Sequence, residues 1–188
     1  MLYLLGGAAR SGKTIIAQRL LKERCIPYFC IDYFVSALEQ GAPELGILGE
    51  SPTLPKAGEL WTLLKPLLVN IIEVEPHYLV EGDTLLPGKV VELRGIYPSD
   101  VRICFLGYPR LTPEEKMKEI RQFGGSVNDW IQEHTDDYIL ELTAEMVDFS
   151  QYLQRECQEH NVQFFDTSRQ FLQSVDQAFN YLREGISP

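Results

Sequence analysis

Short apolar runs alternate along the chain with longer stretches in which apolar residues recur at helical spacing. The five apolar runs are residues 2–5, 28–31, 78–80, 101–106 and 162–165. Each has the length of a strand that is buried on both faces. Between the first two, Ile15, Ile16, Leu20 and Leu21 follow the three-to-four-residue period of a helix packed by one face. This alternation predicts an α/β fold with a five-stranded parallel sheet and helices on both faces.

Four further helices are predicted by spacing and by capping residues. Apolar residues from Leu60 to Ile71 mark one helix, in which Pro66 should cause a kink or mark a start. Thr112, Pro113 and Glu115 form a capping box, so a second helix should run from about Pro113 to Phe123. A long helix is expected over about 128–160, and Phe171, Val175, Phe179 and Leu182 share one face of a closing helix.

The remaining segments predict one domain with two appendages. The chain of 188 residues has the size of a single domain, and no stretch resembles an interdomain linker. The Gly- and Pro-rich sequence GAPELGILGESPTLPKAG indicates an irregular flap, at about 34–56. A second mobile part, a lid, is expected at about 108–130. Its hinges would be Gly107-Tyr108-Pro109 and Gly124-Gly125.

The chain begins with a sequence typical of a phosphate-binding loop. Gly7, Gly12, Lys13 and Thr14 match the pattern G-x-x-x-x-G-K-[ST], between an apolar strand and an amphipathic helix. In such a loop the glycines allow phosphates to approach closely, and main-chain amides and the helix N-terminus attract the anion. The lysine contacts the β- and γ-phosphates, and the threonine hydroxyl binds Mg²⁺. The residues predicted to contact the nucleotide are Gly7, Ala8, Ala9, Arg10, Ser11, Gly12, Lys13 and Thr14.

Composition narrows the possible partners. The formal net charge is −10, from 27 acidic and 17 basic residues, which disfavours a nucleic-acid surface. No apolar run approaches the roughly 18 residues of a membrane helix. The four cysteines show no paired metal-ligand spacing and are interpreted as reduced, mostly buried side chains. These features predict a cytoplasmic protein that acts on a small molecule, as a monomer or a homodimer.

With the phosphate-binding loop in place, the chain resembles the small P-loop kinases, the group of nucleotide, shikimate, gluconate and chloramphenicol phosphotransferases. The resemblance covers the whole length. It comprises the loop at the N-terminus, CIDYF after the second strand, LVEGD at the third, an arginine-bearing lid after the fourth, and FFDTSR at the fifth. It implies a three-layer P-loop NTPase fold with a helical lid, and ATP and Mg²⁺ as cofactors. Only the loop motif is highly specific.

Two acids at strand ends are the candidate groups around the transferred phosphate. Ligands of open parallel sheets lie outside the carboxyl ends of the strands, and Asp32 and Glu81 are expected there, with the second strand next to the first or one strand away. Asp32 could accept the proton of an attacking hydroxyl, bind substrate or help hold Mg²⁺, and it could also cap a helix. Glu81 could hold Mg²⁺ through water, or bind substrate. Asp83 is interpreted as a turn cap.

Four arginines are the candidate cationic groups. Phosphoryl transfer requires positive charge around the migrating group, and Arg110 and Arg121 of the lid are predicted to supply it. The lid lysines have the alternative explanation of solvated Glu–Lys pairing. Arg169 follows the fifth strand, where similar kinases place the adenine. Arg94 is a candidate for binding an anionic acceptor, with a surface arginine as the alternative.

The sequence therefore predicts an ATP-dependent phosphotransferase that moves the γ-phosphate to a hydroxyl or phosphate of a small metabolite. Two alternatives stay open: a nucleotide-binding regulatory protein without an acceptor, and a nucleoside monophosphate kinase. The second is disfavoured because residues 33–76 contain Lys56 and Lys65 but no arginine.

Overall fold

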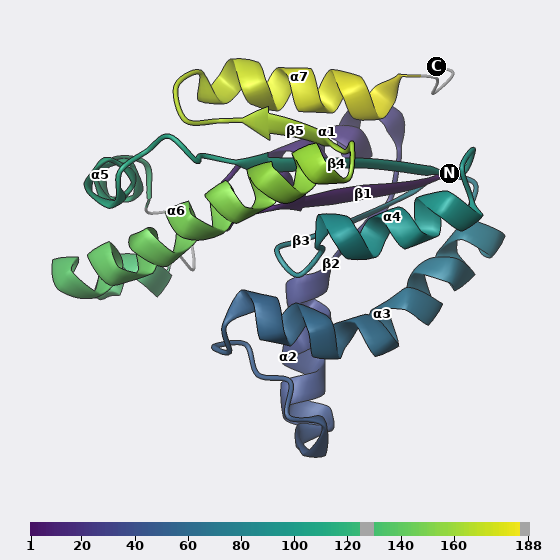
Figure 1. Ribbon diagram of the computed structural model, residues 1–188, viewed down its shortest axis with the longest axis horizontal. Coiled ribbons are helices and arrows are strands. Elements are labelled where there is room, and N and C mark those ends of the chain that lie inside the picture. Colours follow the sequence, from purple (N-terminus) through teal and green to yellow (C-terminus); the bar gives the residue numbers. More distant parts are fainter. Residues whose placement is uncertain (125–129, 185–188) are drawn as a thin grey trace.

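Five parallel strands form one sheet in the order β2-β3-β1-β4-β5 (Figure 1). The structure is a computed structural model and describes residues 1–124 and 130–184. The strands are β1 Leu2–Gly7, β2 Tyr28–Cys30, β3 Tyr78–Gly82, β4 Val101–Gly107 and β5 Gln163–Asp166. The predicted α/β class and five-stranded parallel sheet are confirmed, and β2 lies one strand away from β1.

The central strand β1 is buried on both faces. Leu2 and Leu4 belong to the core on one face of the sheet, and Tyr3 and Leu5 belong to the core on the other. Alternate side chains of a strand point to opposite faces, so a strand covered on both sides must be apolar at every position. This requirement explains the uninterrupted apolar run near the N-terminus.

Helices cover the two faces unequally, as Figure 1 shows. The α-helices are α1 Lys13–Arg24, α2 Ile31–Gly41, α3 Thr53–Val74, α4 Pro87–Ile96, α5 Pro113–Phe123, α6 Asp136–Glu159 and α7 Phe171–Arg183. α1 and α7 pack on the face of Tyr3 and Leu5. α2, α3, α4 and α6 pack on the opposite face, where Trp61 of α3 lies in the core. Two short 3₁₀ helices, Pro43–Leu45 and Trp130–Glu133, precede α3 and α6.

The segment predicted as a flap contains more helix than expected. α2 occupies 31–41 and α3 begins at Thr53, so the irregular part within the described chain is reduced to 42–52. The apolar residues Ile31 and Val35 are buried against the sheet. Their four-residue spacing is that of one helix face, but two residues are a short signal, and the Gly- and Pro-rich sequence that follows favoured an irregular segment.

Three further boundaries differ from the sequence-based expectation. α3 continues through Pro66, whose position on the helix is exposed. α4, a helix of ten residues with Pro87 at its first position, was not predicted at all. α6 begins at Asp136, where Thr135 caps it by accepting a hydrogen bond from the Tyr138 amide, and the expected start near 128 lies outside the described residues.

The lid helix α5 follows its prediction residue for residue. The Glu115 amide donates to Thr112 Oγ1 over 3.2 Å, and the Thr112 amide donates to Glu115 Oε2 over 2.9 Å. The capping box is therefore formed in both directions. The predicted lid includes Gly125, which lies outside the described residues.

Among the residues described, no helix combines the length and the apolar character that a membrane span requires.

Candidate functional site

The loop between β1 and α1 has a backbone that only glycine fits at two positions. Gly7 and Gly12 have φ of 149° and 105°. A Cβ atom on Gly7 would lie 2.4 Å from the Leu106 carbonyl oxygen, and one on Gly12 would lie 2.8 Å from Val175 Cγ2. β4 and α7 therefore pack closely against the loop and leave no room for side chains at these two positions. Arg10, between the glycines, also has positive φ, at 57°.

The loop ends in a helix N-terminus whose amides no side chain caps. Gly12 is the N-cap of α1, and it has no side chain with which to accept a hydrogen bond. The first amides of a helix lack intrahelical partners and carry the positive end of the helix dipole. Together with the turn of the loop, they form an arrangement that binds anions.

Lys13 lies across the loop. Its side chain is buried, and its Nζ donates to the Gly7 carbonyl over 3.0 Å and to the Ala8 carbonyl over 2.9 Å. Both acceptors are neutral main-chain groups, so the positive charge of the lysine is not neutralised by either of them. The ammonium is thus held at the loop by contacts that a phosphate could replace.

Thr14 and Glu81 meet beside the loop. The Thr14 hydroxyl donates to Glu81 Oε1 over 3.2 Å, and Glu81 is 2% exposed at the end of β3, the neighbour of β1. Burial raises the pKa of the Glu81 carboxyl; the Lys13 ammonium opposes that rise and Asp32 adds to it. A hydroxyl and a carboxylate oxygen this close are ligands of the kind that Mg²⁺ takes in phosphate sites.

Asp32 lies in the first turn of α2, directly after β2. The carboxyl ends of β1, β2 and β3 lie at one edge of the sheet, so Asp32 shares that edge with Lys13. Its side chain reaches solvent, yet surrounding protein atoms remove enough hydration to raise the pKa of its carboxyl. Asp83 adds to the rise, whereas Lys13 and Lys56 oppose it.

Cys30 lies between these acids. It pairs with Glu81 across the β2–β3 ladder. Burial, followed by the charges of Glu81 and Asp32, raises the pKa of the Cys30 thiol to about 12. The thiol therefore stays protonated at neutral pH, so it cannot serve as a thiolate nucleophile.

Sequence reasoning did not assign a role to Lys56. This residue is only 7% exposed on α3, its Nζ donates to the Gly49 carbonyl over 2.7 Å, and its charge acts on Asp32. A buried lysine in the first turns of a helix is unfavourable both for hydration and for the helix dipole. Its burial could have been predicted from its position on the apolar face of α3, four residues before Leu60.

Lys116 was grouped in the sequence with solvated lid lysines, but it is 4% exposed. Its Nζ lies 4.0 Å from the centre of the Tyr108 ring and donates to the Arg10 carbonyl of the loop over 3.3 Å. Burial lowers the pKa of Lys116, and Glu119 opposes this change. Tyr108 also donates its hydroxyl to the Ala9 carbonyl over 2.6 Å. The lid and the phosphate-binding loop are thus joined by two side chains.

The predicted lid arginines are engaged with acids. Arg110 forms an ion pair with Asp166 at the end of β5, over 2.9 Å, and its own side chain is 69% exposed. Arg121 bonds to Asp136 and to the carbonyls of Gln132 and His134, so it ties α5 to the segment before α6.

Arg169 and Arg94 occupy different edges of the sheet. Arg169 follows β5 and contacts Glu115 of α5 over 3.3 Å, on the side of the phosphate-binding loop. Arg94 instead donates to the carbonyls of His160 and Asn161, just before β5 begins. The start of a parallel strand lies at the edge opposite the loop. The structure therefore does not bring Arg94 together with the other candidate residues.

A pocket of about 500 Å³ opens beside Arg10, between the lid helix and the start of α7. Ile120 and Phe123 of α5 line one side, and Phe171 and Leu172 of α7 line the other. Lys116 and Glu119 contribute charged groups to the lining. The pocket adjoins the loop, and its size and mixed lining are typical of sites for ring-containing ligands.

Comparisons with known proteins give structural matches only. No family model matches the chain, and no curated protein matches it. A gluconokinase from Sinorhizobium meliloti superposes with a TM-score of 0.60 at 14% identity, over 98% of this chain and 92% of that one. A shikimate kinase from Bacteroides thetaiotaomicron gives 0.57 at 15%, over 97% and 98%. A putative kinase from Chloroflexus aurantiacus gives 0.52 at 14%, over 99% and 98%. The chain therefore has the fold of the P-loop small-molecule kinases.

Proposed function

We propose that this protein is an ATP-dependent phosphotransferase that moves the γ-phosphate of ATP to a hydroxyl of a small metabolite. The observation that carries the proposal is the grouping at one sheet edge of the glycine loop, the Lys13 ammonium and the acids Glu81 and Asp32. The fold shared with small-molecule kinases supports it.

The nucleotide would lie along the loop, with its phosphates on the main-chain amides and on Lys13. The uncapped N-terminus of α1 suits the negative charge of the phosphates, whereas the Ala8 and Ser11 amides already donate to the Leu106 and Ala8 carbonyls. The base would enter the pocket between α5 and α7, where the Phe123 and Phe171 side chains offer apolar surface. Arg169 lies on the same side of the molecule and pairs with α5.

Thr14 and Glu81 are the residues that would hold Mg²⁺. Their oxygens lie 3.2 Å apart beside the loop, and both atoms are of the type that the ion binds. Mg²⁺ held there would supply positive charge that offsets the negative charge of the phosphates.

Asp32 would act as the base in the transfer. Its carboxylate takes the proton from the acceptor hydroxyl as the hydroxyl oxygen bonds to the γ-phosphorus. The bond from that phosphorus to the bridging oxygen breaks, and ADP leaves with the electron pair. The proton on Asp32 then passes to water. A carboxyl whose pKa is raised by burial is a better proton acceptor than an ordinary aspartate.

The lid would supply positive charge and exclude water. Lys116 is already in contact with the loop carbonyl of Arg10. Arg110 and Arg121 would reach the phosphates only if their ion pairs with Asp166 and Asp136 open. We therefore infer that these two arginines act on closure of the lid, after the nucleotide is bound.

For the acceptor we propose a molecule that carries an anionic group as well as the hydroxyl. Lys56 is a buried cation that donates to a neutral carbonyl, that of Gly49, and its charge acts on Asp32. The other lysine of the acceptor segment, Lys65, forms an ion pair with Glu92 over 2.7 Å. We therefore assign to Lys56 the role that the sequence suggested for Arg94, which is binding of an anionic acceptor.

A turnover screen with matched acceptors tests the proposal. ADP production from Mg·ATP is measured with polyols that differ in one carboxylate, such as D-gluconate and D-glucitol, within a panel of hydroxylated metabolites. We expect an acceptor with an anionic group to raise turnover, and Lys56→Met to raise its KM about tenfold or more. Lys65→Met is the matched control. Tight ATP binding without stimulation by any acceptor would favour a regulatory nucleotide-binding protein.

A further inference from the structure

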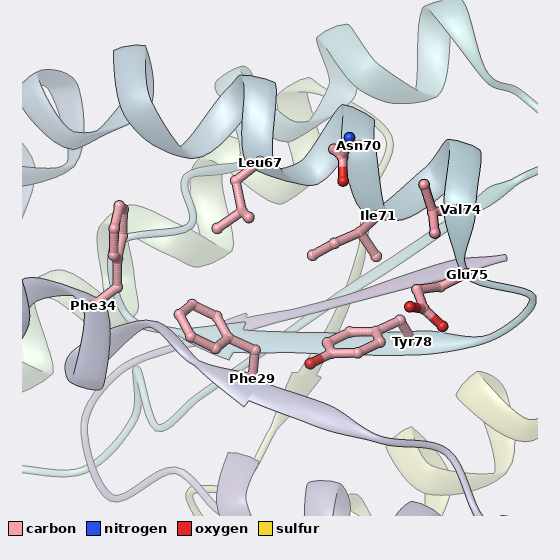
Figure 2. A pocket seen from close by; sticks show the side chains of 8 residues that line it. All are labelled: Phe29, Phe34, Leu67, Asn70, Ile71, Val74, Glu75 and Tyr78. Carbon is pink, nitrogen blue, oxygen red and sulfur yellow. The ribbon is translucent and has the colours of Figure 1, made fainter.

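A second pocket, separate from the nucleotide site, lies at the β2 edge of the sheet under α3 (Figure 2). Its volume is about 410 Å³, within the range of small-ligand sites. None of its eight lining residues belongs to the phosphate-binding loop or to the acids beside it. Neither the proposed transfer of phosphate nor the shared fold gives it a role.

Three aromatic rings shape this pocket. Phe29 is paired with Val80, and Tyr78 lies two residues before Val80, so both rings stand on the same face of the sheet. Phe34 of α2 closes one end, with its ring centre 6.3 Å from that of Phe29 and tilted by 58°. Figure 2 shows the Phe29 and Tyr78 rings below α3, with Leu67 and Ile71 above them.

The one charged side chain that lines the pocket is an acid, and the polar side chains of the lining have no bonding partner within the described protein. Its lining contains a single ionisable acid, Glu75, and contains no lysine, arginine or histidine. Among the residues that the structure describes, the side chains of Asn70, Glu75 and Tyr78 make no hydrogen bond or ion pair. Such groups at the margin of an apolar pocket are available to fix a ligand.

The charges point to one chemical class of ligand. Aromatic faces are electron-rich and attract organic cations, and a carboxylate beside them adds a full negative charge. The formal net charge of −10 adds a long-range attraction for cations. We propose that this pocket binds a small organic ammonium, with its cationic head against the Tyr78 ring and Glu75, at the end of the pocket away from Phe34 (Figure 2), and its apolar body under α3.

Calorimetry on the full chain tests the proposal with a pair of isosteres. The probes are choline and its neutral analogue 3,3-dimethyl-1-butanol, which has the same shape without the charge. We expect choline to bind, and the neutral analogue to bind at least about fivefold more weakly, as expected from loss of a cation–π contact. Absence of choline binding up to about 10 mM, or equal affinity for both probes, would overturn the proposal.

Variants locate the binding. Glu75→Gln and Tyr78→Leu should each weaken choline binding about fivefold or more. Glu59→Gln, an exposed acid on the same helix, is the matched control and should leave the affinity unchanged. Lys13→Met should also leave it unchanged, because Lys13 is not part of this pocket. Glu75→Gln has nearly the same shape as the natural side chain, so unchanged choline affinity in that folded variant contradicts the proposed site.

Discussion

At the scale of single residues, the proposed chemistry depends on charges held where water cannot fully solvate them. The buried Lys13 ammonium donates to two neutral carbonyls, and Glu81 is almost completely buried. Both arrangements cost stability in the free protein, because ionised groups lose hydration. We infer that this cost is recovered when phosphates and Mg²⁺ bind, which is the usual relation between function and stability at such sites.

Two substitutions separate binding from transfer. Lys13→Ala removes the ammonium from the phosphates, so we expect loss of measurable phosphate transfer and a large loss of ATP affinity. Asp32→Asn removes the base, and transfer should fall by about 10²–10⁴-fold while ATP affinity stays nearly intact. Single-turnover kinetics and calorimetry measure the two properties. An Asp32→Asn enzyme that turns over at the natural rate would remove Asp32 from the mechanism.

The raised pKa of Glu81 predicts a pH-dependent gain in stability for Glu81→Gln. Because the folded-state pKa is above the ordinary value, the natural protein binds more protons when folded, and it loses stability as pH rises through the folded-state pKa. The variant lacks this loss. We expect its Tm to exceed that of the natural protein by ~2 °C or more at pH 7, and the difference to vanish below the ordinary glutamate pKa of about 4.3. Thermal melts between pH 4 and 7 measure this, and a gain independent of pH would contradict it.

At the scale of elements, side chains at and before α5 contact the main chain of the loop between β1 and α1. α5 begins at a capping box that is formed in both directions, and its Lys116 reaches the Arg10 carbonyl of the loop. Tyr108, before α5, reaches the Ala9 carbonyl. We infer that a change in the angle of α5 would move the main chain of this loop, on which we propose the phosphates lie.

A pair of lysines on α5 tests this coupling. Lys116→Met keeps the length and apolar stem of the side chain but removes the bond to the loop, so we expect kcat/KM for ATP to fall about tenfold. Lys118→Met on the exposed face of the same helix is the control and should change little. Steady-state kinetics with varied ATP measure the effect. Equal behaviour of the two variants would show that the contact between α5 and the loop has no functional role.

At the scale of the whole molecule, the sheet order places the proposed groups. β1 is central, with β3 between it and β2, so the loop, Glu81 and Asp32 follow one another along a single edge. The pocket between α5 and α7, which we propose takes the nucleotide base, lies on the other side of the loop. The two proposed substrates thus approach the phosphate from opposite sides of β1.

Binding at this edge should stabilise the whole domain. At a Mg·ATP concentration about 100 times its Kd, linkage predicts a gain of about 2.7 kcal/mol in the free energy of unfolding. For a chain of this size the corresponding rise in Tm is about 5 °C or more. Differential scanning fluorimetry measures it, and Lys13→Ala should abolish most of it. Absence of a shift with either Mg·ATP or Mg·GTP would contradict the proposed nucleotide site.

Local patterns were enough to predict much of this protein. The glycine loop between β1 and α1, the five apolar strands and the capping box of α5 each depend on residues close together in the chain, and the structure forms these local elements as expected. Glycines at positive φ and a cap with its reciprocal acid are determined by local geometry, so they are visible in the sequence.

Only the tertiary structure decided which charged side chains are buried and where each one lies. Lys56 and Lys116 resemble surface lysines in the sequence, yet packing buries both of them. Arg94 resembles an acceptor-binding group, yet it lies at the opposite edge of the sheet. The order of the strands and the pairing of distant elements determine these environments, and contacts between residues far apart in the chain leave no periodic signal in it.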